Sequence, residues 1–185
     1  MSVQTQDDSI FEGSESFTLS ANASATVGGD RFNLTDTGTG TITDDRDGAN
    51  NADTPELSVS SDSVVEGGAA VFNVELSNDV DGDVTYEFAL SLDGQNAEWD
   101  DFASNPLSVS YQLDGVTYSA TANNDGSYTI AGNATDIQVS VQTQDDSIFE
   151  GSESFTLSAN ASATVGGDRF NLTDTGTGTI TDDRD

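Results

Sequence analysis

Carboxylates are the side chains of this sequence that are best placed to do chemistry. The stretch "DDSIFEGSESFTLS" occurs twice, at residues 7–20 and 145–158, and each copy brings four acids to the start of an alternating apolar run. Carboxylates held this close together repel one another unless a positive group lies between them. A strand that begins in such a cluster therefore needs a neutralising partner.

The composition of the chain limits what that partner can be. There are 34 acids and four bases, all of them arginine, which gives a net charge of −30. With only 34% hydrophobic residues, a chain this acidic lies close to the composition of disordered proteins unless its charge is neutralised. The sign of the charge excludes nucleic acid and anionic membranes as partners, and it favours a multivalent cation.

The residue types that are missing limit the possible activities. The sequence has no His, Cys or Lys, so the usual pairs of nucleophile and base cannot form, and we expect neither an enzyme nor a small-molecule substrate. No apolar run is long enough to span a bilayer, so we expect no membrane insertion. Calcium accepts six to eight oxygen ligands from flexible acidic loops, whereas magnesium retains its waters and zinc or copper would recruit His or Cys. Calcium is therefore the expected cofactor.

The chain contains a long internal repeat. Residues 2–47 are identical to residues 140–185, so every residue of the first stretch recurs 138 positions later. A period of this length indicates a tandem array of whole domains rather than the turns of a solenoid. We expect residues 1–47 to be the C-terminal third of a preceding repeat, 48–53 a linker and 54–185 a complete repeat, with adjacent identical repeats as partners in the same chain.

The apolar residues of the complete repeat recur with a spacing of two. This spacing is found in "LSVSSDSVV", "AVFNVEL", "VTYEFALSL", "LSVSYQL", "TDIQVSVQT", "SFTLSAN" and "GTGTIT", with turn signals between the runs. Seven or more strands of this kind predict an all-β fold, an immunoglobulin-like antiparallel β-sandwich. Residues 107–128 are expected to form an extra hairpin, with Asp114 and Gly115 as its two-residue turn.

The topology of such a sandwich predicts where the acids meet. Consecutive strands run in opposite directions, so alternate loops gather at the same end of the molecule. Several clusters of acids in the complete repeat lie in or beside four of those loops. We expect ten carboxylates at this pole, enough to hold two or more calcium ions: Glu66, Asp100, Asp101, Asp145, Asp146, Glu150, Glu153, Asp182, Asp183 and Asp185.

A second set of acids is expected at the opposite pole, which faces the preceding repeat. The stretch "NDVDGDV" does not fit an EF-hand, because no twelve-residue loop closes on a Glu. It is either an ordinary acidic turn or part of an ion site between domains. The candidate ligands of such an interdomain ion are Asp44, Asp45, Asp47, Asp53, Asp79, Asp81 and Asp83.

Several motifs together resemble the Calx-beta family, β-sandwich modules of sodium/calcium exchangers that are also common in giant bacterial surface adhesins. The motifs are "VVEGG", "WDDF", "IAGNATDIQVSVQTQDDSIFEGSESFTLS" and "GTGTITDDRD", and the resemblance extends over nearly all of residues 54–185. Phe102 stands where the family usually has Tyr. The resemblance implies calcium ligation by Glu66, Asp101, Asp145, Asp146, Glu150, Glu153, Asp182 and Asp183.

The repeat and the resemblance together lead to an expected function. We expect an extender repeat of a long RTX-type bacterial adhesin, exported by type I secretion to the cell surface. There, many calcium-stabilised sandwiches would project a distal binding domain for attachment or biofilm formation. The alternatives are a regulatory calcium-sensing module and a direct ligand-binding adhesin domain, the latter suggested by the row Thr175, Thr177, Thr179 and Thr181 on one strand face.

Overall fold

Strands make up nearly all of the regular structure. The computed structural model describes residues 2–44 and 53–182, so Asp45, Asp47, Asp183 and Asp185 of the expected sites lie outside the described residues. No helix in the described ranges has the length and apolar character needed to cross a membrane. The elements are β1 (Glu15–Val27), β2 (Asp30–Ile42), β3 (Leu57–Val59), β4 (Asp62–Val65), β5 (Ala69–Leu76), β6 (Asp83–Ser91), the short 3-10 helix η1 (Trp99–Asp101), β7 (Phe102–Leu113), β8 (Val116–Ser119), β9 (Tyr128–Ala131), β10 (Thr135–Thr143), β11 (Ser152–Val165) and β12 (Asp168–Thr181).

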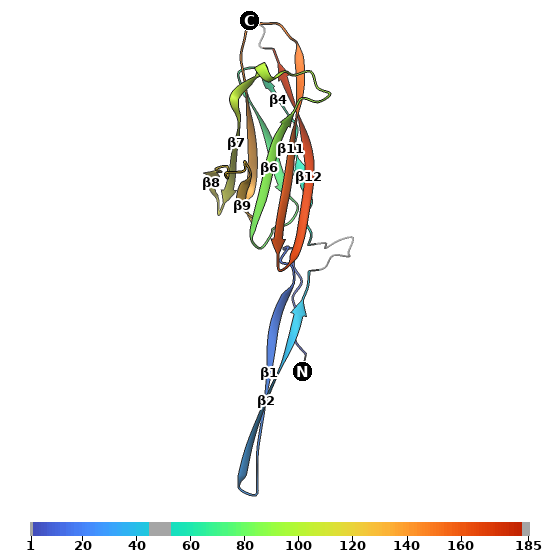
Figure 1. The fold of residues 1–185 in the computed structure, drawn as a ribbon, viewed down its shortest axis with the longest axis vertical. Coiled ribbons are helices and arrows are strands. Elements are labelled where there is room, and N and C mark those ends of the chain that lie inside the picture. Colours follow the sequence, from blue (N-terminus) through green and yellow to red (C-terminus); the bar gives the residue numbers. More distant parts are fainter. Residues whose placement is uncertain (1, 45–52, 183–185) are drawn as a thin grey trace.

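Two five-stranded sheets pack face to face in the second part of the chain (Figure 1). Their strand orders are β3-β5-β10-β7-β8 and β4-β12-β11-β6-β9. Alternate residues of these strands point inward, as the spacing of two requires. The predicted immunoglobulin-like β-sandwich is therefore confirmed.

The first predicted strand, "LSVSSDSVV", is wrong as a single element. The chain changes sheets at Ser60, so that β3 pairs antiparallel with β5 while β4 pairs parallel with β12. The crossover is possible because Gly176 has no side chain: a Cβ there would lie 2.0 Å from the Ser60 carbonyl oxygen. Polar side chains complete the missing backbone pairing, and the Asp174 carboxylate accepts a 2.7 Å hydrogen bond from the Val59 amide.

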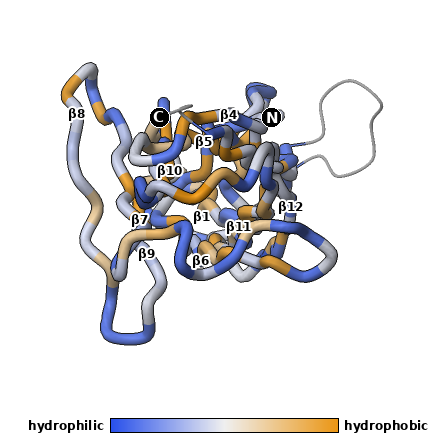
Figure 2. Tube along the Cα trace, turned by 90° about the horizontal axis from the view of Figure 1, so that it is seen from above, coloured by the Kyte–Doolittle hydropathy of each residue, from blue (hydrophilic) through white to orange (hydrophobic). Residues whose placement is uncertain are grey.

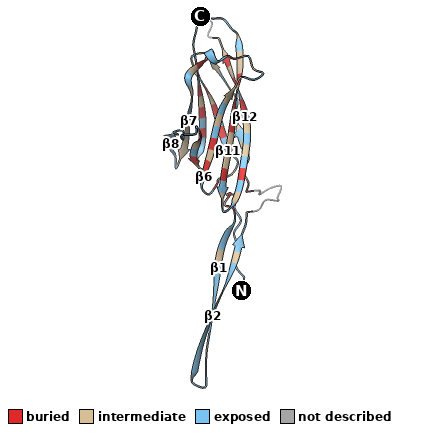
Figure 3. Ribbon diagram, in the orientation of Figure 1, coloured by how far each residue is buried: buried red, intermediate tan, exposed pale blue. Residues whose placement is uncertain are grey.

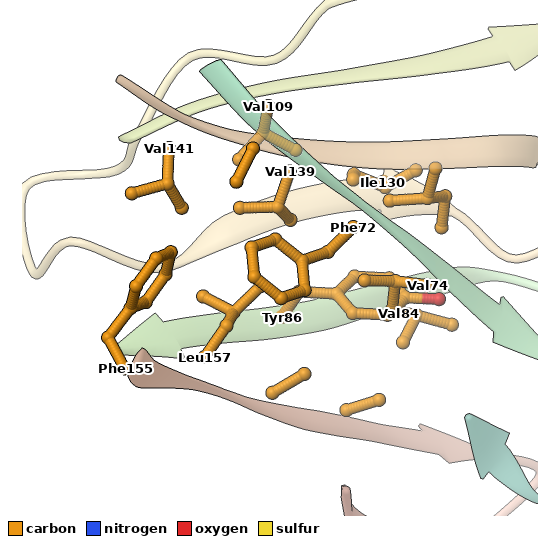
Figure 4. Packing of buried hydrophobic residues seen from close by; sticks show 14 of the residues in the cluster. Phe72, Val74, Val84, Tyr86, Val109, Ile130, Val139, Val141, Phe155 and Leu157 are labelled. Carbon is orange, nitrogen blue, oxygen red and sulfur yellow. The ribbon is translucent and has the colours of Figure 1, made fainter. Parts of the chain in front are cut away.

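The core lies between the two sheets and combines aromatic rings with a larger number of aliphatic side chains (Figure 4). Phe155 is fully buried and packs edge to face against Phe72 and Phe102, with ring centroids 5.9 and 5.0 Å apart. Gly178 gives this ring its space, since a Cβ there would lie 2.2 Å from the Phe155 ring.

The segment predicted as an extra hairpin, residues 107–128, belongs partly to the sandwich itself. β7 begins at Phe102 and pairs with β10, so it belongs to the sheet, and β8 alone extends it. The Asp114 and Gly115 turn is confirmed, because Leu113 pairs with Val116 and both turn residues have positive φ, at 52° and 75°. Seen down the long axis, β8 lies at the side of the sandwich (Figure 2). Its four residues are exposed, as expected for an edge strand.

The N-terminal hairpin β1-β2 repeats β11-β12 in structure as well as in sequence. Both hairpins have the same register, with Glu15 opposite Ile42 and Glu153 opposite Ile180. The N-terminal copy continues the long axis of the molecule beyond the sandwich and stays largely exposed (Figure 3). In the residues that the structure describes, β1 and β2 form a sheet of their own, without the strands that cover β11-β12.

The two copies predict unequal effects of the same substitution. Leu157 is 0% exposed, whereas its identical counterpart Leu19 is 41% exposed. We expect Leu157→Ala to lower the free energy of unfolding of the sandwich by about 2–5 kcal/mol, since it removes buried methyl groups and leaves a cavity. Leu19→Ala should change it by less than about 0.5 kcal/mol. Urea unfolding of both variants tests this, and equal effects would contradict the difference in burial.

Candidate metal centre

Three loops are tied together by backbone hydrogen bonds at the pole where the chain ends (Figure 1). The Gln144 amide donates to the Asp101 carbonyl at 2.7 Å, which joins the loop after β10 to η1. The Gly67 amide donates to the Gln144 carbonyl at 3.1 Å, and the Glu66 amide donates to the Thr181 carbonyl at 3.0 Å. The acids that these loops carry are thereby held on one small surface.

Three carboxylates converge at this pole. One side-chain oxygen from each of Asp101, Glu150 and Glu153 lies within 4.8 Å of the other two. Asp101 is oriented by η1, because its carboxylate accepts a hydrogen bond from the Glu98 amide at 2.5 Å. Glu153 is fixed by β11, whose pairing with β12 begins one residue earlier. Residues that are 52 positions apart in sequence are thus brought together by the sandwich.

The pKa values of two of these acids, Glu150 and Glu153, are raised at this pole. Partial burial, the hydrogen bond and charge of Asp101, and the charges of Glu150 and Glu98 together raise the pKa of Glu153 to about 7. The pKa of Glu150 is also raised, first by desolvation and then by the charges of Asp101, Asp146, Glu98 and Asp182. Desolvation and the neighbouring negative charges thus disfavour the ionised forms of Glu150 and Glu153 when no metal ion is bound.

Two further acids shape the loop before β11. The Asp182 carboxylate accepts hydrogen bonds from the Glu150 amide at 3.4 Å and the Gly151 amide at 3.1 Å. The Asp146 carboxylate accepts one from the Ile148 amide at 2.6 Å. These bonds hold the loop in a turn that presents Glu150 to Asp101 and Glu153.

The donor set of the cluster fits calcium. All three converging groups are carboxylates on loops or strand ends, the ligand type that calcium prefers. The described arginines, Arg31 and Arg169, pair with Thr26 and Thr164 beside the turns of the two hairpins, away from this pole. Neither of these two arginines therefore supplies neutralising charge to the cluster. When bound, calcium would supply that charge, and Asp101, Glu150 and Glu153 would hold it.

The other expected ligands lie near the three converging acids but are not grouped with them within 4.8 Å among the described residues. Glu66 follows β4 beside the end of β12. Asp145 lies behind the Gly67 turn, where an added Cβ on Gly67 would be 2.9 Å from the Asp145 Cβ. Asp100 is exposed on η1.

The sequence analysis missed Glu98 and its neighbours. The negative charge of Glu98 helps to raise the pKa values of both Glu150 and Glu153. The preceding amide side chain of Asn96 accepts a 2.9 Å hydrogen bond from the Ser154 amide, which anchors the loop before η1 to β11. A signal was present in "NAEWDD", because Glu98 lies three residues before Asp101 and one turn of 3-10 helix brings such residues together.

A second acidic cluster lies at the other pole, where the N-terminal segment meets the sandwich. The pKa of Glu12 is raised, first by burial and then by the charges of Asp8, Glu15, Asp81 and Asp44. Acids of the N-terminal segment thus face Asp81 of the "NDVDGDV" loop.

The remaining acids of the interdomain set have different positions. Asp53 is 6% exposed and lines a cavity of about 170 Å³ together with Asp44. The carbonyl of Asp79 accepts a hydrogen bond from the Phe11 amide at 2.9 Å. Asp83 is exposed at the start of β6.

Comparison with known proteins identifies one family. The model of the Calx-beta domain matches residues 1–46 and 110–184. No curated protein sequence matches the chain. The match leaves out residues 47–109, so it is narrower than the resemblance that the motifs indicated and does not include "VVEGG" or "WDDF".

Solved structures with a similar arrangement are distant. The seventh ScaB type I cohesin of Pseudobacteroides cellulosolvens has 13% identity and a TM-score of 0.36, over 69% of this chain and 91% of that chain. AggA, the major subunit of aggregative adherence fimbriae type I of Escherichia coli, has 13% identity and a TM-score of 0.36, over 70% and 94%. The CooA pilin subunit of enterotoxigenic Escherichia coli has 13% identity and a TM-score of 0.34, over 70% and 99%. Likenesses of this size do not bear on function.

The raised pKa of Glu153 predicts an unusual pH dependence in the absence of metal. In the folded state its pKa is about 7, above the ordinary value of 4.5, so the folded state binds the proton more tightly than the unfolded state. Its contribution to stability is therefore complete below pH 4.5 and is lost as the pH rises through 7. In EDTA we expect the melting temperature to rise when the pH is lowered from 8 to 5.

Glu153→Gln should reduce this rise, and Glu87→Gln, which removes the same charge from an exposed position within β6, serves as the control. Water screens a partly exposed carboxyl, so the difference between the variants should be about 1 kcal/mol or less, which corresponds to about 2–4 °C. Thermal unfolding followed by circular dichroism measures it. Identical pH profiles for the two variants would contradict the cluster at Asp101, Glu150 and Glu153.

Proposed function

Since the chain belongs to the Calx-beta domain family, we propose that it is a calcium-stabilised extender repeat of a long bacterial cell-surface adhesin. Its role is structural. Many such sandwiches, joined end to end, would hold a distal binding domain away from the cell for attachment or biofilm formation. The observation that carries this proposal is the identity of residues 2–47 and 140–185. It is supported by the position of the first copy, which extends the long axis of the sandwich (Figure 1).

Calcium suits an extracellular repeat for an electrostatic reason. The acidic chain carries a net charge of −30, and its converging carboxylates oppose folding when no cation is present. At the millimolar calcium outside a cell, weak acidic sites of this kind are filled. A chain exported by type I secretion would then remain loose until it reached that calcium, and folding would follow export.

The acids at the junction are the proposed ligands of a second, interdomain ion. Asp8, Glu12, Glu15 and Asp81 oppose one another there. The ligands that the sequence predicts for this ion are Asp44, Asp45, Asp47, Asp53, Asp79, Asp81 and Asp83. An ion shared across this junction would fix the angle between successive repeats.

A regulatory calcium sensor is the main alternative. The two functions differ in the affinity that they require, because intracellular sensors bind calcium near micromolar concentration and extracellular modules near millimolar concentration. The direct ligand-binding alternative has less support. In the Thr row, the Thr181 hydroxyl donates to the Val64 carbonyl at 3.3 Å, so that end of the row serves the pairing of β4 with β12.

Calcium should stabilise the folded chain. An ion that binds only the folded state contributes about 2.7 kcal/mol per site at 100 times its dissociation constant, which corresponds to about 5–10 °C for a chain of this size. We expect calcium to raise the melting temperature above that in EDTA, and magnesium to do so less. Asp101→Asn combined with Glu153→Gln should abolish most of the gain, whereas Glu87→Gln, at an exposed position within β6, should retain it.

The calcium titration of this stability separates the hypotheses. Half of the effect near millimolar calcium supports an extender, whereas half near micromolar calcium supports a sensor. Equal melting temperatures in EDTA, calcium and magnesium would refute the proposed calcium role.

The interdomain ion predicts a stiffer junction in calcium. In a chain lengthened by a further copy of residues 48–185, we expect small-angle scattering to show a larger maximum dimension, by about 10% or more, when calcium replaces EDTA. Charge neutralisation is the reason, because unscreened acids on both sides of a junction repel and let it bend. Asp81→Asn with Asp83→Asn should reduce the increase. A scattering curve that does not change with calcium would contradict the interdomain ion.

A further inference from the structure

Two neighbouring apolar residues are exposed in one loop at the acidic pole of the sandwich. Phe149 is 85% exposed and Ile148 is 61% exposed, in the loop between β10 and β11. Their surroundings in sequence are identical to those of Phe11, which is only 2% exposed. The same phenylalanine is therefore a core residue in the first copy and a surface residue in the second.

Phe11 is buried by the opposite pole of the complete sandwich. Its ring packs edge to face against that of Phe170, with centroids 5.3 Å apart. Its amide donates to the Asp79 carbonyl at 2.9 Å, and its carbonyl accepts from the Asp81 amide at 3.0 Å. These two bonds form a parallel bridge to Val80, so Phe11 is held by both its side chain and its backbone.

Glycines next to Phe11 confirm that this contact is close. A Cβ on Gly13 would lie 2.1 Å from the Val165 carbonyl oxygen, and a Cβ on Gly166 would lie 2.6 Å from the Ser14 amide nitrogen. The counterparts of these two glycines, Gly151 and Gly28, have no atom within 4 Å of an added Cβ, leaving out their chain neighbours. Of these four glycines, only the two where the N-terminal segment meets the sandwich lie against a neighbouring backbone.

The exposed loop already has the internal hydrogen bonds of the buried one. In the first copy the Asp44 carboxylate accepts from the Gly13 amide at 2.7 Å, and in the second the Asp182 carboxylate accepts from the Gly151 amide at 3.1 Å. Asp8 and Asp146 likewise accept from the amides two residues later. The loop that carries Phe149 is thus held in shape before it contacts anything, which lowers the entropy cost of docking.

We propose that Phe149 and Gly151 form the docking surface for the base of a following copy of the sandwich, equivalent to residues 53–182. Phe149 would pack on that copy's counterpart of Phe170 and bridge to its counterpart of Val80. The occupant is specified by the structure, because the residues that receive Phe11 all belong to the complete sandwich and the residues that dock are repeated unchanged. The proposal rests on the proposed array of repeats for its occupant, but not on calcium.

The test compares identical substitutions in the two copies. In the 185-residue chain, the Asp81 amide is bonded to Phe11 and should exchange slowly with deuterium. Phe11→Ala should speed its exchange on the order of 100-fold, because a buried phenylalanine is lost, whereas Phe149→Ala should leave it unchanged.

The decisive sample is the full chain lengthened by a further copy of residues 48–185. There, Phe149→Ala should speed exchange of the added copy's counterpart of the Asp81 amide on the order of 100-fold, while Phe11→Ala should act only on Asp81 itself. Gly13→Ala and Gly151→Ala provide a second pair. Both glycines have positive φ, at 75° and 87°, so each substitution strains its own loop to a similar extent. Faster exchange at one junction than at the other then reports the loss of the close backbone contact at that junction.

Two results would overturn the proposal. One is unchanged exchange at the added copy's junction in Phe149→Ala. The other is rapid exchange of both junction amides in the lengthened parent chain. Measurement in calcium and in EDTA separates this proposal from the proposed function. If Phe149→Ala speeds exchange equally in calcium and EDTA and calcium does not change the melting temperature, the docking is supported and the calcium role is refuted. If calcium raises the melting temperature and Phe149→Ala does not change exchange, the calcium role is supported and the docking is refuted.

Discussion

The apolar face of a two-stranded hairpin has to be covered, and the architecture of this protein follows from that requirement. In β11-β12, the inward residues Phe155, Leu157 and Phe170 are buried against the facing sheet. In β1-β2, Leu19 and Phe32 remain 41% and 48% exposed, although the residues are the same. Burial of apolar surface is the main favourable term in folding, so a hairpin of this sequence is stable only when other strands cover its apolar face. The remaining strands of the sandwich provide that cover for β11-β12.

Charge acts in the opposite direction at the ends of the same hairpin. The core is apolar in the middle, whereas the acids gather where strands end and loops meet water. The raised pKa values of Glu150 and Glu153 at one pole and of Glu12 at the other show that these acids oppose one another. A cation relieves this repulsion locally. One of these poles is also where the N-terminal segment meets the sandwich, so the acids and the junction contacts lie beside one another there.

The junction combines apolar, steric and polar contacts in a small area. Phe11 supplies a buried ring, Gly13 and Gly166 allow the two backbones to approach, and the Ser14 hydroxyl donates to the Asp168 carboxylate at 3.3 Å. None of these contacts needs a metal ion. A junction with such contacts has a preferred angle before any ion binds, and an ion would add stiffness to an existing arrangement.

The sequence by itself determined the local pairing. The spacing of two, the turn at Asp114 and Gly115 and the register of both long hairpins depend on neighbouring residues, and the identical copies form the same ladder. The gathering of Asp101, Glu150 and Glu153 was also predictable, because alternate loops of a sandwich share an end. The change of sheet at Ser60 was not, since it depends on the missing side chain of Gly176, more than a hundred residues later. Glu98 was not predicted, because its charge acts on Glu150 and Glu153 only after folding brings their loops together.

Only the tertiary structure decided which of two identical residues is buried. Phe11 and Phe149 have the same neighbours in sequence, yet one is 2% exposed and the other 85%. Gly13 and Gly151 differ in the same way, one in close contact with Val165 and the other open. Local sequence fixes backbone conformation through steric and hydrogen-bonding preferences that act over a few residues. Burial depends on what the rest of the chain brings to the same place, so identical segments can differ in it completely.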